Sequence, residues 1–262
     1  MSFKVAASDF DGTLYRDEEF LAEDLSAISD WRAAGNKFGI VTGRCRTMIV
    51  PLLTKHGVET DFLICDNGAI IFDGAGRILF ETELPKAILF ELMAEPFVQR
   101  SLHFAFETAD AVSCANVKPE SWVMRENQRW KFPIDIIEPA QIERLGKINQ
   151  FALLFETPDE ALAATNTLND KFGERIHAQK NTYSVDIVAA GIDKAQGVGN
   201  LLRIMNWSAA AVHVIGDESN DLPMIRRFGG CTVSTAKAFV KREATTIFNS
   251  VGNMMKYFQK NP

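Results

Sequence analysis

The chain has 262 residues, of which 47% are hydrophobic and 24% charged, and its formal net charge is −6. This composition is typical of a globular protein with one large domain or two modest ones, and it excludes a low-complexity chain. Because Lys and Arg form no basic block and the balance is acidic, we expect no nucleic-acid partner.

The first predicted element is a buried strand over residues 3–7. It is followed by the stretch Ser8-Asp9-Phe10-Asp11-Gly12-Thr13-Leu14. Asp9 and Asp11 are two residues apart, so extended geometry would project both to one side, and Gly12 permits a sharp turn. Two carboxylates this close need a counter-charge, for which Mg²⁺ with oxygen ligands is the simplest choice. The alternative is an Asx-turn that closes the strand with both aspartates in solvent.

Strands and helices then alternate up to about residue 80. The apolar spacing predicts a helix over residues 21–35, and a second helix is expected to open at Thr42-Gly43-Arg44 and to end at Gly57. Further strands are predicted at 38–41 and 62–65, and a β-hairpin at 70–80. This alternation favours a parallel sheet covered by helices on both faces.

The pattern changes between about residues 84 and 188. The helices predicted there span 87–98 and 157–172, the second opened by the capping box that Thr157 and Glu160 form. The predicted strands are 102–107, 150–155, 176–178 and 183–188, with a candidate strand at Trp122-Val123-Met124. We interpret the segment as a separate α+β unit with an antiparallel sheet, inserted into the first domain.

The alternation of strands and helices resumes near residue 189. Gly191-Ile192-Asp193-Lys194 opens a helix up to Met205, and a buried strand over 212–215 leads into the loop Gly216-Asp217-Glu218-Ser219-Asn220-Asp221. The elements predicted after this loop are a short helix to Phe228, a strand at 231–233 and helices at 238–244 and 251–258. Residues 1–83 and 189–262 are therefore predicted to form one core domain, with residues 84–188 as the insert.

Each polar motif follows a predicted strand, and the carboxyl ends of parallel strands form the ligand crevice of an open α/β sheet. The fold would therefore gather residues that are far apart in sequence: Asp9, Asp11, Thr42, Lys194, Asp217 and Asp221. Taken alone, Thr42-Gly43-Arg44 is most often a helix N-cap and a single lysine is usually a solvated charge. Their order along the chain and their placement at strand ends favour a joint site.

The motifs in this order resemble those of the haloacid dehalogenase superfamily, in its Cof-type branch, where a cap is inserted between the second and third motifs. The resemblance implies a Rossmann-like, doubly wound parallel core with an inserted α+β cap. It also implies a Mg²⁺-dependent phosphatase acting on small phosphorylated metabolites, most commonly sugar phosphates. Where such proteins usually carry Gly-Asn-Ala, this chain has Ser234-Thr235-Ala236, which removes one auxiliary asparagine contact.

The resemblance and the needs of phosphoryl transfer together suggest a role for each motif. Asp9 would be the nucleophile that forms an aspartyl-phosphate, and Asp11 the general acid and then base. Lys194 would neutralise charge. The Mg²⁺ ligands would be Asp9, Asp217 and Asp221 with the backbone carbonyl of Asp11. The residues expected to contact the substrate are Thr42, Gly43, Asn67, Gly68, Lys194 and Asn220.

Substrate selection is expected to come from the cap. The candidates are Trp122, Arg125, Arg129, Trp130, Lys180 and Tyr183. For each of them we favour the alternative without a substrate contact, in which the tryptophans belong to the cap core and the arginines are solvated. Two other functions stay open: a phosphomutase of the phosphomannomutase-like type, and a non-catalytic phosphometabolite-binding protein. The sequence does not indicate the oligomeric state.

The four cysteines lie at positions with no paired spacing, so free thiols in a reducing compartment are expected. The N-terminus shows no basic segment followed by an apolar core, so no secretion signal is expected. No apolar run approaches the roughly 20 residues that cross a bilayer. We therefore expect a cytoplasmic protein with no membrane partner.

Overall fold

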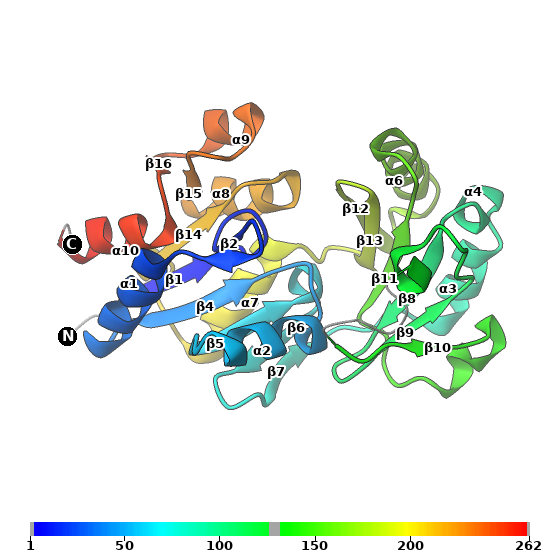
Figure 1. Cartoon of the computed structure of the whole chain (residues 1–262), viewed down its shortest axis with the longest axis horizontal. Coiled ribbons are helices and arrows are strands. Elements are labelled where there is room, and N and C mark those ends of the chain that lie inside the picture. The colour runs from blue at the N-terminus through cyan, green and yellow to red at the C-terminus, as the bar shows by residue number, and fades with distance from the viewer. Residues whose placement is uncertain (1–2, 126–131, 261–262) are drawn as a thin grey trace. The chain divides into compact units, whose positions relative to one another are not determined.

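The computed structural model of the chain describes residues 3–125 and 132–260 (Figure 1). The described chain divides into two compact units. The first unit comprises Met1–Thr42, Leu53–Phe80 and Asp193–Pro262, and the second comprises Gly43–Leu52 and Glu81–Ile192. The domain boundaries expected from the sequence, 1–83 and 189–262 against 84–188, remain a prediction about independently folding domains. The segment Gly43–Leu52, which we expected in the core domain, groups with the second unit.

An eight-stranded sheet forms the centre of the first unit (Figure 1). Its strands in spatial order are β16 (Ile247–Phe248), β15 (Cys231–Val233), β14 (Val212–Gly216), β1 (Val5–Ser8), β4 (Lys37–Val41), β5 (Phe62–Cys65), β6 (Ile70–Asp73) and β7 (Ile78–Glu81). The strands from β16 to β5 are parallel, and β6 runs antiparallel to β5. This arrangement confirms the expected α/β fold with a parallel core sheet.

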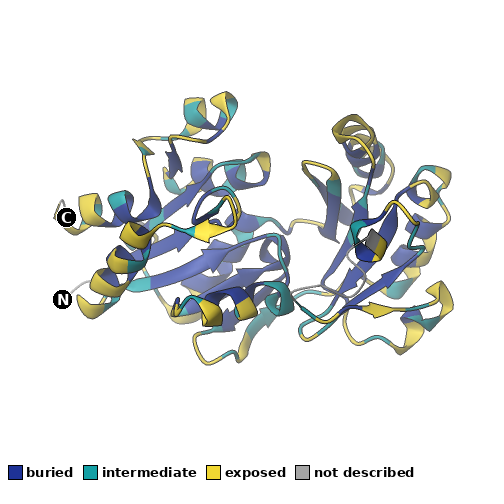
Figure 2. Cartoon of the chain, in the orientation of Figure 1, coloured by how far each residue is buried: buried dark blue, intermediate teal, exposed yellow. Residues whose placement is uncertain are grey.

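Helices cover both faces of this sheet. The helices of the first unit are α1 (Ala22–Ala33), α7 (Lys194–Met205), α8 (Leu222–Phe228), α9 (Ala238–Glu243) and α10 (Val251–Lys260). Val214 of β14 packs in one apolar cluster with Leu201 of α7. The preceding residue, His213, contacts Trp31 of α1 and stacks on Phe258 of α10. Because successive strand residues face opposite sides and helices cover both, nearly all residues of the central strands are buried, as Figure 2 shows in dark blue.

The second unit contains a six-stranded sheet. Its strands in spatial order are β10 (Asp135–Ile136), β9 (Val112–Ala115), β8 (His103–Glu107), β11 (Gln150–Leu154), β13 (Ser184–Ala189) and β12 (Ile176–Asn181). Its helices are α3 (Lys86–Met93), α4 (Pro96–Gln99), α5 (Trp122–Arg125) and α6 (Pro158–Phe172). The pairing is antiparallel as expected, except that β10 runs parallel to β9. Phe104, Phe106 and Phe151 pack on one face with residues of α3 and α6.

The remaining short elements are a β-hairpin, one helix and four 3-10 helices. They are β2 (Tyr15–Arg16), β3 (Glu19–Phe20), α2 (Arg46–Lys55), η1 (Asp66–Gly68), η2 (Pro139–Arg144), η3 (Ala209–Ala211) and η4 (Ser219–Asp221). Among the described residues, no helix combines the length and apolarity that crossing a bilayer requires. All four cysteines belong to the described residues, where they are buried and form no disulfide.

Three local predictions were wrong. The candidate strand at Trp122-Val123-Met124 is the helix α5, because the Ser121 hydroxyl accepts the Val123 N–H at 3.1 Å and caps its first turn. The helix expected over 87–98 is two helices, since Pro96 begins α4 and cannot continue α3. The helix expected to open at Thr42-Gly43-Arg44 begins at Arg46, so these residues lie in a loop. The capping box of Thr157 and Glu160 is confirmed.

Candidate active site

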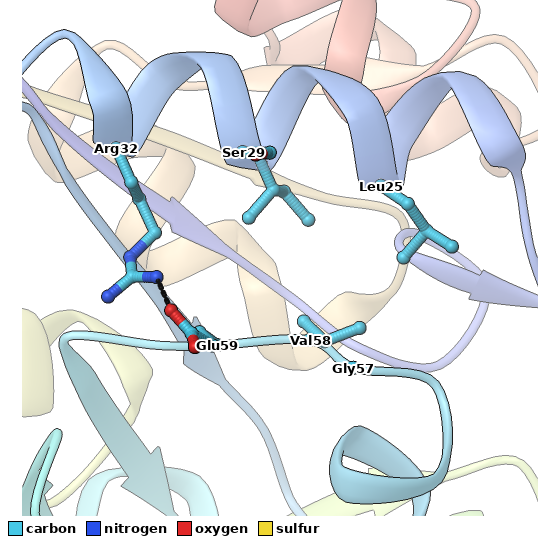
Figure 3. Close-up of a pocket in the computed structure, with 7 residues that line it drawn as sticks. Leu25, Ser29, Arg32, Gly57, Val58 and Glu59 are labelled. Atoms are coloured by element: carbon cyan, nitrogen blue, oxygen red, sulfur yellow. Dashed lines mark hydrogen bonds and ion pairs between the residues drawn. The ribbon is translucent and has the colours of Figure 1, made fainter.

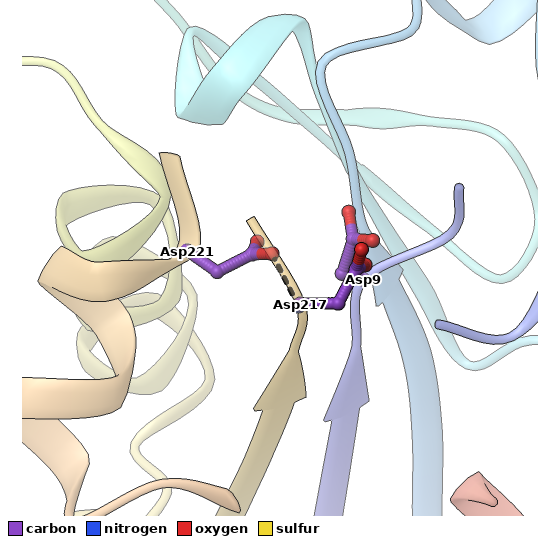
Figure 4. A group of neighbouring side chains, drawn as sticks. All are labelled: Asp9, Asp217 and Asp221. Atoms are coloured by element: carbon purple, nitrogen blue, oxygen red, sulfur yellow. Dashed lines mark hydrogen bonds between the residues drawn. The ribbon is translucent and has the colours of Figure 1, made fainter. Parts of the chain in front are cut away.

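Two carboxylates meet where adjacent parallel strands end. Asp9 directly follows β1, and Asp217 directly follows β14. The register pairs Ser8 with Ile215, and the Asp9 N–H continues the ladder by donating to the Ile215 carbonyl at 2.9 Å. Since the chain leaves both strands at the same edge, Asp9 and Asp217 lie side by side although 208 positions separate them in sequence (Figure 4).

The turn after Asp9 is fitted to the Asp217 side chain. Gly12 adopts φ +82°, and a Cβ atom there would collide with the Asp217 carboxylate. Thr13, which is fully buried, donates its hydroxyl to Asp217 Oδ1 at 2.6 Å. Both the backbone conformation and the space therefore require glycine at position 12.

Lys194 is the buried cation of the cluster, with 1% of its surface exposed. It is the first residue of α7, whose N-cap Asp193 accepts the Gln196 N–H at 2.7 Å. The Lys194 ammonium donates to Asp9 Oδ1 at 2.7 Å and to Asp221 Oδ1 at 2.6 Å. Burial alone would lower the pKa of Lys194, but Asp221 and Asp9 together raise it above its usual value.

Asp221 has partners inside the protein for both carboxylate oxygens. Its Oδ1 accepts from Lys194, and its Oδ2 accepts the N–H groups of Asp217 and Glu218 at 2.9 and 3.0 Å. A Cβ atom at Gly216 would overlap the Asp221 side chain, so the loop closes tightly on it. Asp221 therefore fixes both the lysine and the loop that carries Asp217.

The cluster holds more negative than positive charge. Burial and the neighbouring Asp221 raise the pKa of Asp9 well above its ordinary value, with Lys194 acting in the opposite direction. Burial, with a further contribution from Asp221, raises the pKa of Asp217 to about 6, against the hydrogen bond from Thr13. Because burial and like charges disfavour ionisation, the carboxylates need additional positive charge to remain fully ionised.

The donor set fits a divalent cation. Asp9, Asp217 and Asp221 each offer an oxygen within 4.8 Å of the others (Figure 4). When all are ionised, three carboxylates against the one ammonium of Lys194 leave an excess of two negative charges. Hard oxygen ligands of this kind suit Mg²⁺.

Thr42 lies at the carboxyl end of β4, the other neighbour of β1. It is buried, its N–H donates to the Ile64 carbonyl at 2.8 Å, and its carbonyl accepts the Asn67 N–H at 3.0 Å. Gly43 follows in the loop before α2, and its carbonyl accepts from the Gln150 side chain at 2.9 Å. Sequence reasoning missed Gln150, because no local pattern marks a contact between residues 107 positions apart.

Asn67, Gly68 and Asn220 pack together near the beginning of α7. Asn67 adopts φ +52° in the 3-10 helix η1, and its Oδ1 accepts from Asn220 Nδ2 at 3.1 Å. Gly68 adopts φ +103°, and a Cβ atom there would overlap the Asp193 carbonyl, the N-cap of α7. Asn220 therefore has Asn67 as a hydrogen-bond partner, and its expected contact with the substrate stays a prediction.

The other predicted residues are Asp11 in the first unit and the candidates of the second unit, some of which lie outside the described residues. Asp11 is exposed and is not one of the three aspartates whose oxygens converge. Trp122 packs edge-on against Phe132, and Tyr183 is 47% exposed. Lys180 is half-buried. Arg129, Trp130 and the side chain of Arg125 lie outside what the structure describes.

A cavity of about 290 Å³ also lies in the first unit, between α1 and the segment before β5 (Figure 3). Its lining residues are Leu25, Ile28, Ser29, Arg32, Gly57, Val58 and Glu59. Arg32 and Glu59 pair with each other across it. The cavity shares no residue with the carboxylate cluster, so it is not the candidate active site.

The profile of the haloacid dehalogenase-like hydrolases matches residues 6–253. A pyridoxal phosphate phosphatase from Escherichia coli is 24% identical over 258 residues, which cover 94% of this chain and 93% of the relative.

Two solved structures share the fold. A haloacid dehalogenase-like hydrolase from B. subtilis superimposes with a TM-score of 0.84 at 18% identity, covering 97% of this chain and 99% of that one. A subclass IIB sugar phosphatase superimposes with a TM-score of 0.81 at 20% identity, covering 98% of this chain and 99% of the other. At these identities the structures establish the fold alone.

Proposed function

The chain belongs to the haloacid dehalogenase-like hydrolases of the Cof type and is a phosphoric monoester hydrolase, and we propose that Asp9 is its nucleophile. The proposed reaction is the Mg²⁺-dependent hydrolysis of small phosphorylated metabolites, sugar phosphates foremost, through an aspartyl-phosphate. The observation that carries this proposal is the buried Asp9 carboxylate, held at 2.7 Å from Lys194 and beside Asp217 and Asp221.

In the proposed first step, an Asp9 carboxylate oxygen attacks the phosphorus and the bond to the leaving oxygen breaks. Asp11 gives its proton to that oxygen, so the alcohol leaves neutral. The exposed position of Asp11 suits a group that must meet both the leaving alcohol and the attacking water. Thr42 and the Gly43 N–H are proposed to donate hydrogen bonds to the phosphoryl oxygens.

In the proposed second step, a water attacks the phosphorus of the aspartyl-phosphate while Asp11 takes up its proton. The acyl–phosphate bond breaks, inorganic phosphate leaves, and Asp9 is restored as a carboxylate. Lys194 stays paired with Asp9 and with Asp221, so the charge on the nucleophile is balanced on one side throughout. Because Asp221 fixes the ammonium, Lys194 needs no reorganisation during the reaction.

Asp9 and Asp217, with Asp221 close by, would hold the Mg²⁺ ion. When bound, this ion would supply positive charge that balances the carboxylates and the phosphoryl oxygens. The raised pKa values of Asp9 and Asp217 support this assignment, since both groups need such a charge to stay ionised.

The experiment that tests the proposal is phosphate release from p-nitrophenyl phosphate with and without Mg²⁺. We expect Mg²⁺-dependent release that Asp9→Asn removes, whereas the exposed control Asp30→Asn leaves it unchanged. Adding a sugar acceptor separates hydrolysis from mutase transfer, because a mutase would phosphorylate the sugar. Full turnover in Asp9→Asn would overturn the proposal.

A further inference from the structure

The short hairpin of β2 and β3 directly follows the turn that carries Asp11. Gly12 donates its N–H to the Tyr15 carbonyl at 2.9 Å, and Asp11 and Tyr15 form an isolated β-bridge. The Tyr15 N–H in turn donates to the Phe10 carbonyl at 2.8 Å, and the rings of these two residues stack with their centroids 5.0 Å apart. The position of the backbone around Asp11 therefore depends on the position of the hairpin.

The turn of this hairpin is strained. Asp17 and Glu18, the two residues between its strands, adopt φ values of +51° and +62°. Two-residue hairpin turns with positive φ at both positions favour Asn-Gly, because most side chains are disfavoured in this conformation. Such a backbone persists only where the surrounding structure holds it. Contacts outside the turn must therefore keep the hairpin in place.

Arg16, the last residue of β2, ties the hairpin to two helices. Its Nη1 donates to the Asn249 carbonyl at 3.0 Å, just before α10, and its Nη2 lies 3.7 Å from Asp24 Oδ2 in the first turn of α1. Asp24 is fully buried, and its Oδ1 accepts the Gly252 N–H of α10 at 2.7 Å. The pair of Arg16 and Asp24 thus joins the hairpin to the beginnings of α1 and α10.

Net stability does not explain this ion pair. Arg16 Nε and Nη2 and Asp24 Oδ2 are buried, and none of these atoms has a hydrogen-bond partner among the described residues. Burial raises the pKa of Asp24, while the Gly252 N–H and the Arg16 charge act in the opposite direction. The desolvation of a buried pair can exceed the attraction between its charges, so two apolar side chains would stabilise the fold as well or better. The pair is better explained by the position that it imposes on the hairpin.

We propose that Arg16, held by Asp24, is a positioning residue that places Asp11 for protonation of the leaving oxygen. This inference rests on the proposed function, in which Asp11 is the general acid, and it adds a residue that the proposed mechanism does not contain. Arg16 acts through the backbone, because its guanidinium fixes β2 and the Tyr15 carbonyl of β2 accepts the Gly12 N–H next to Asp11. Neither Arg16 nor Asp24 needs to contact the substrate.

The test compares phenyl phosphate with p-nitrophenyl phosphate, which are similar in shape but differ in their leaving groups. Phenolate is more basic than p-nitrophenolate, so its departure gains more from a general acid. The quantity measured is the ratio of the two kcat/KM values, phenyl phosphate over p-nitrophenyl phosphate. A variant with a smaller folded fraction loses equally with both substrates, so loss of structure alone leaves this ratio unchanged.

Arg16→Met removes the charge and keeps an unbranched apolar side chain. We expect it to lower the ratio about tenfold, because general acid catalysis contributes on the order of 10²–10⁴ and a displaced acid retains part of that. Arg242→Met, at an exposed position of α9 in the same unit, is the matched control and should leave the ratio unchanged. Should Arg16→Met fold poorly, Asp24→Asn is the second variant, because it removes the facing charge and keeps an oxygen for the Gly252 N–H.

A double variant separates an effect through Asp11 from any other effect. Asp11→Asn removes the proposed acid and should itself lower the ratio. If Arg16 acts through Asp11, adding Arg16→Met to Asp11→Asn should not lower the ratio further, since the two residues serve one function.

A loss with phenyl phosphate no larger than the loss with p-nitrophenyl phosphate would overturn this inference alone, and so would a further fall of the ratio in the double variant. Failure of the wild type to release phosphate from either substrate would overturn the proposed function as well.

Discussion

Lys194 Nζ lies 2.7 Å from Asp9 Oδ1, and both side chains are almost completely buried. A buried ion pair of this kind is costly to break, because the remaining partner keeps its charge without compensation. Asp221 holds the other side of the same ammonium. The pair therefore links the stability of the first unit to the chemistry proposed for Asp9.

Replacing the lysine should affect both stability and activity. In Lys194→Met the carboxylates of Asp9 and Asp221 lose their shared cation, so we expect the free energy of unfolding to fall by about 3–5 kcal/mol. Urea denaturation measures this, with the exposed Lys55→Met as the control. An unchanged urea midpoint in Lys194→Met would show that the Lys194 ammonium does not stabilise the carboxylates of Asp9 and Asp221.

Mg²⁺ should stabilise the protein through Asp217. A ligand at 100 times its Kd stabilises the folded state by about 2.7 kcal/mol, and the Tm should rise accordingly. We expect Asp217→Asn to abolish this rise, because it removes an anionic ligand while Thr13 can still donate to the amide oxygen. Thermal melting of the wild type and of Asp217→Asn, each with and without Mg²⁺, measures the rise in Tm and its loss in the variant.

Asp221→Asn gives the contrasting result in the same melting experiment. Since both Asp221 oxygens already accept hydrogen bonds within the protein, this variant should lower the Tm even without Mg²⁺. If Asp217→Asn keeps the full response to Mg²⁺, the assignment of Asp217 as a ligand is wrong.

The stability of the second unit should fall in mild acid because of His103. Burial lowers the pKa of this side chain to about 4, and its Nδ1 lies 2.8 Å from Ser121 Oγ. Between about pH 6.5 and 4 the unfolded chain takes up a proton on this histidine and the folded chain does not, so stability decreases as the pH falls.

The wild type is compared with His103→Gln, which cannot titrate. The difference in unfolding free energy between the two proteins should change by up to about 3 kcal/mol across this interval, at about 1.4 kcal/mol per pH unit. If the unfolding free energies of the two proteins change with pH in parallel, the loss of stability in mild acid does not come from His103.

The strand ends that carry Asp9 and Asp217 were predictable from sequence, because each follows a continuous apolar run and a parallel sheet aligns such ends. Gly12 was also predictable from its local sequence, because the turn after Asp9 needs a residue with a positive φ. The family was identified from the order of these motifs, and the comparison over residues 6–253 confirms it.

Other features depend on contacts that leave no local signal. The strand β9 is only Val112–Ala115 and is defined by its pairing with β8. The helix α5 opposes the strand preference of Trp122 and Val123 because Ser121 caps it. The hydrogen bond from Gln150 to Gly43, and the ion pair of Arg16 with Asp24, become visible only once the chain is folded.

The most direct test of the account is to find the phosphoryl group on Asp9. In Asp11→Asn the proposed acid and base is missing, so the aspartyl-phosphate should decay slowly and accumulate with an activated aryl phosphate. Rapid acid quench followed by peptide mass spectrometry should then locate one phosphoryl group on Asp9, and none in the Asp9→Asn protein. Mg²⁺-dependent turnover by the wild type with no phosphoryl group on Asp9 in either protein, or with the group on another residue, would contradict the account.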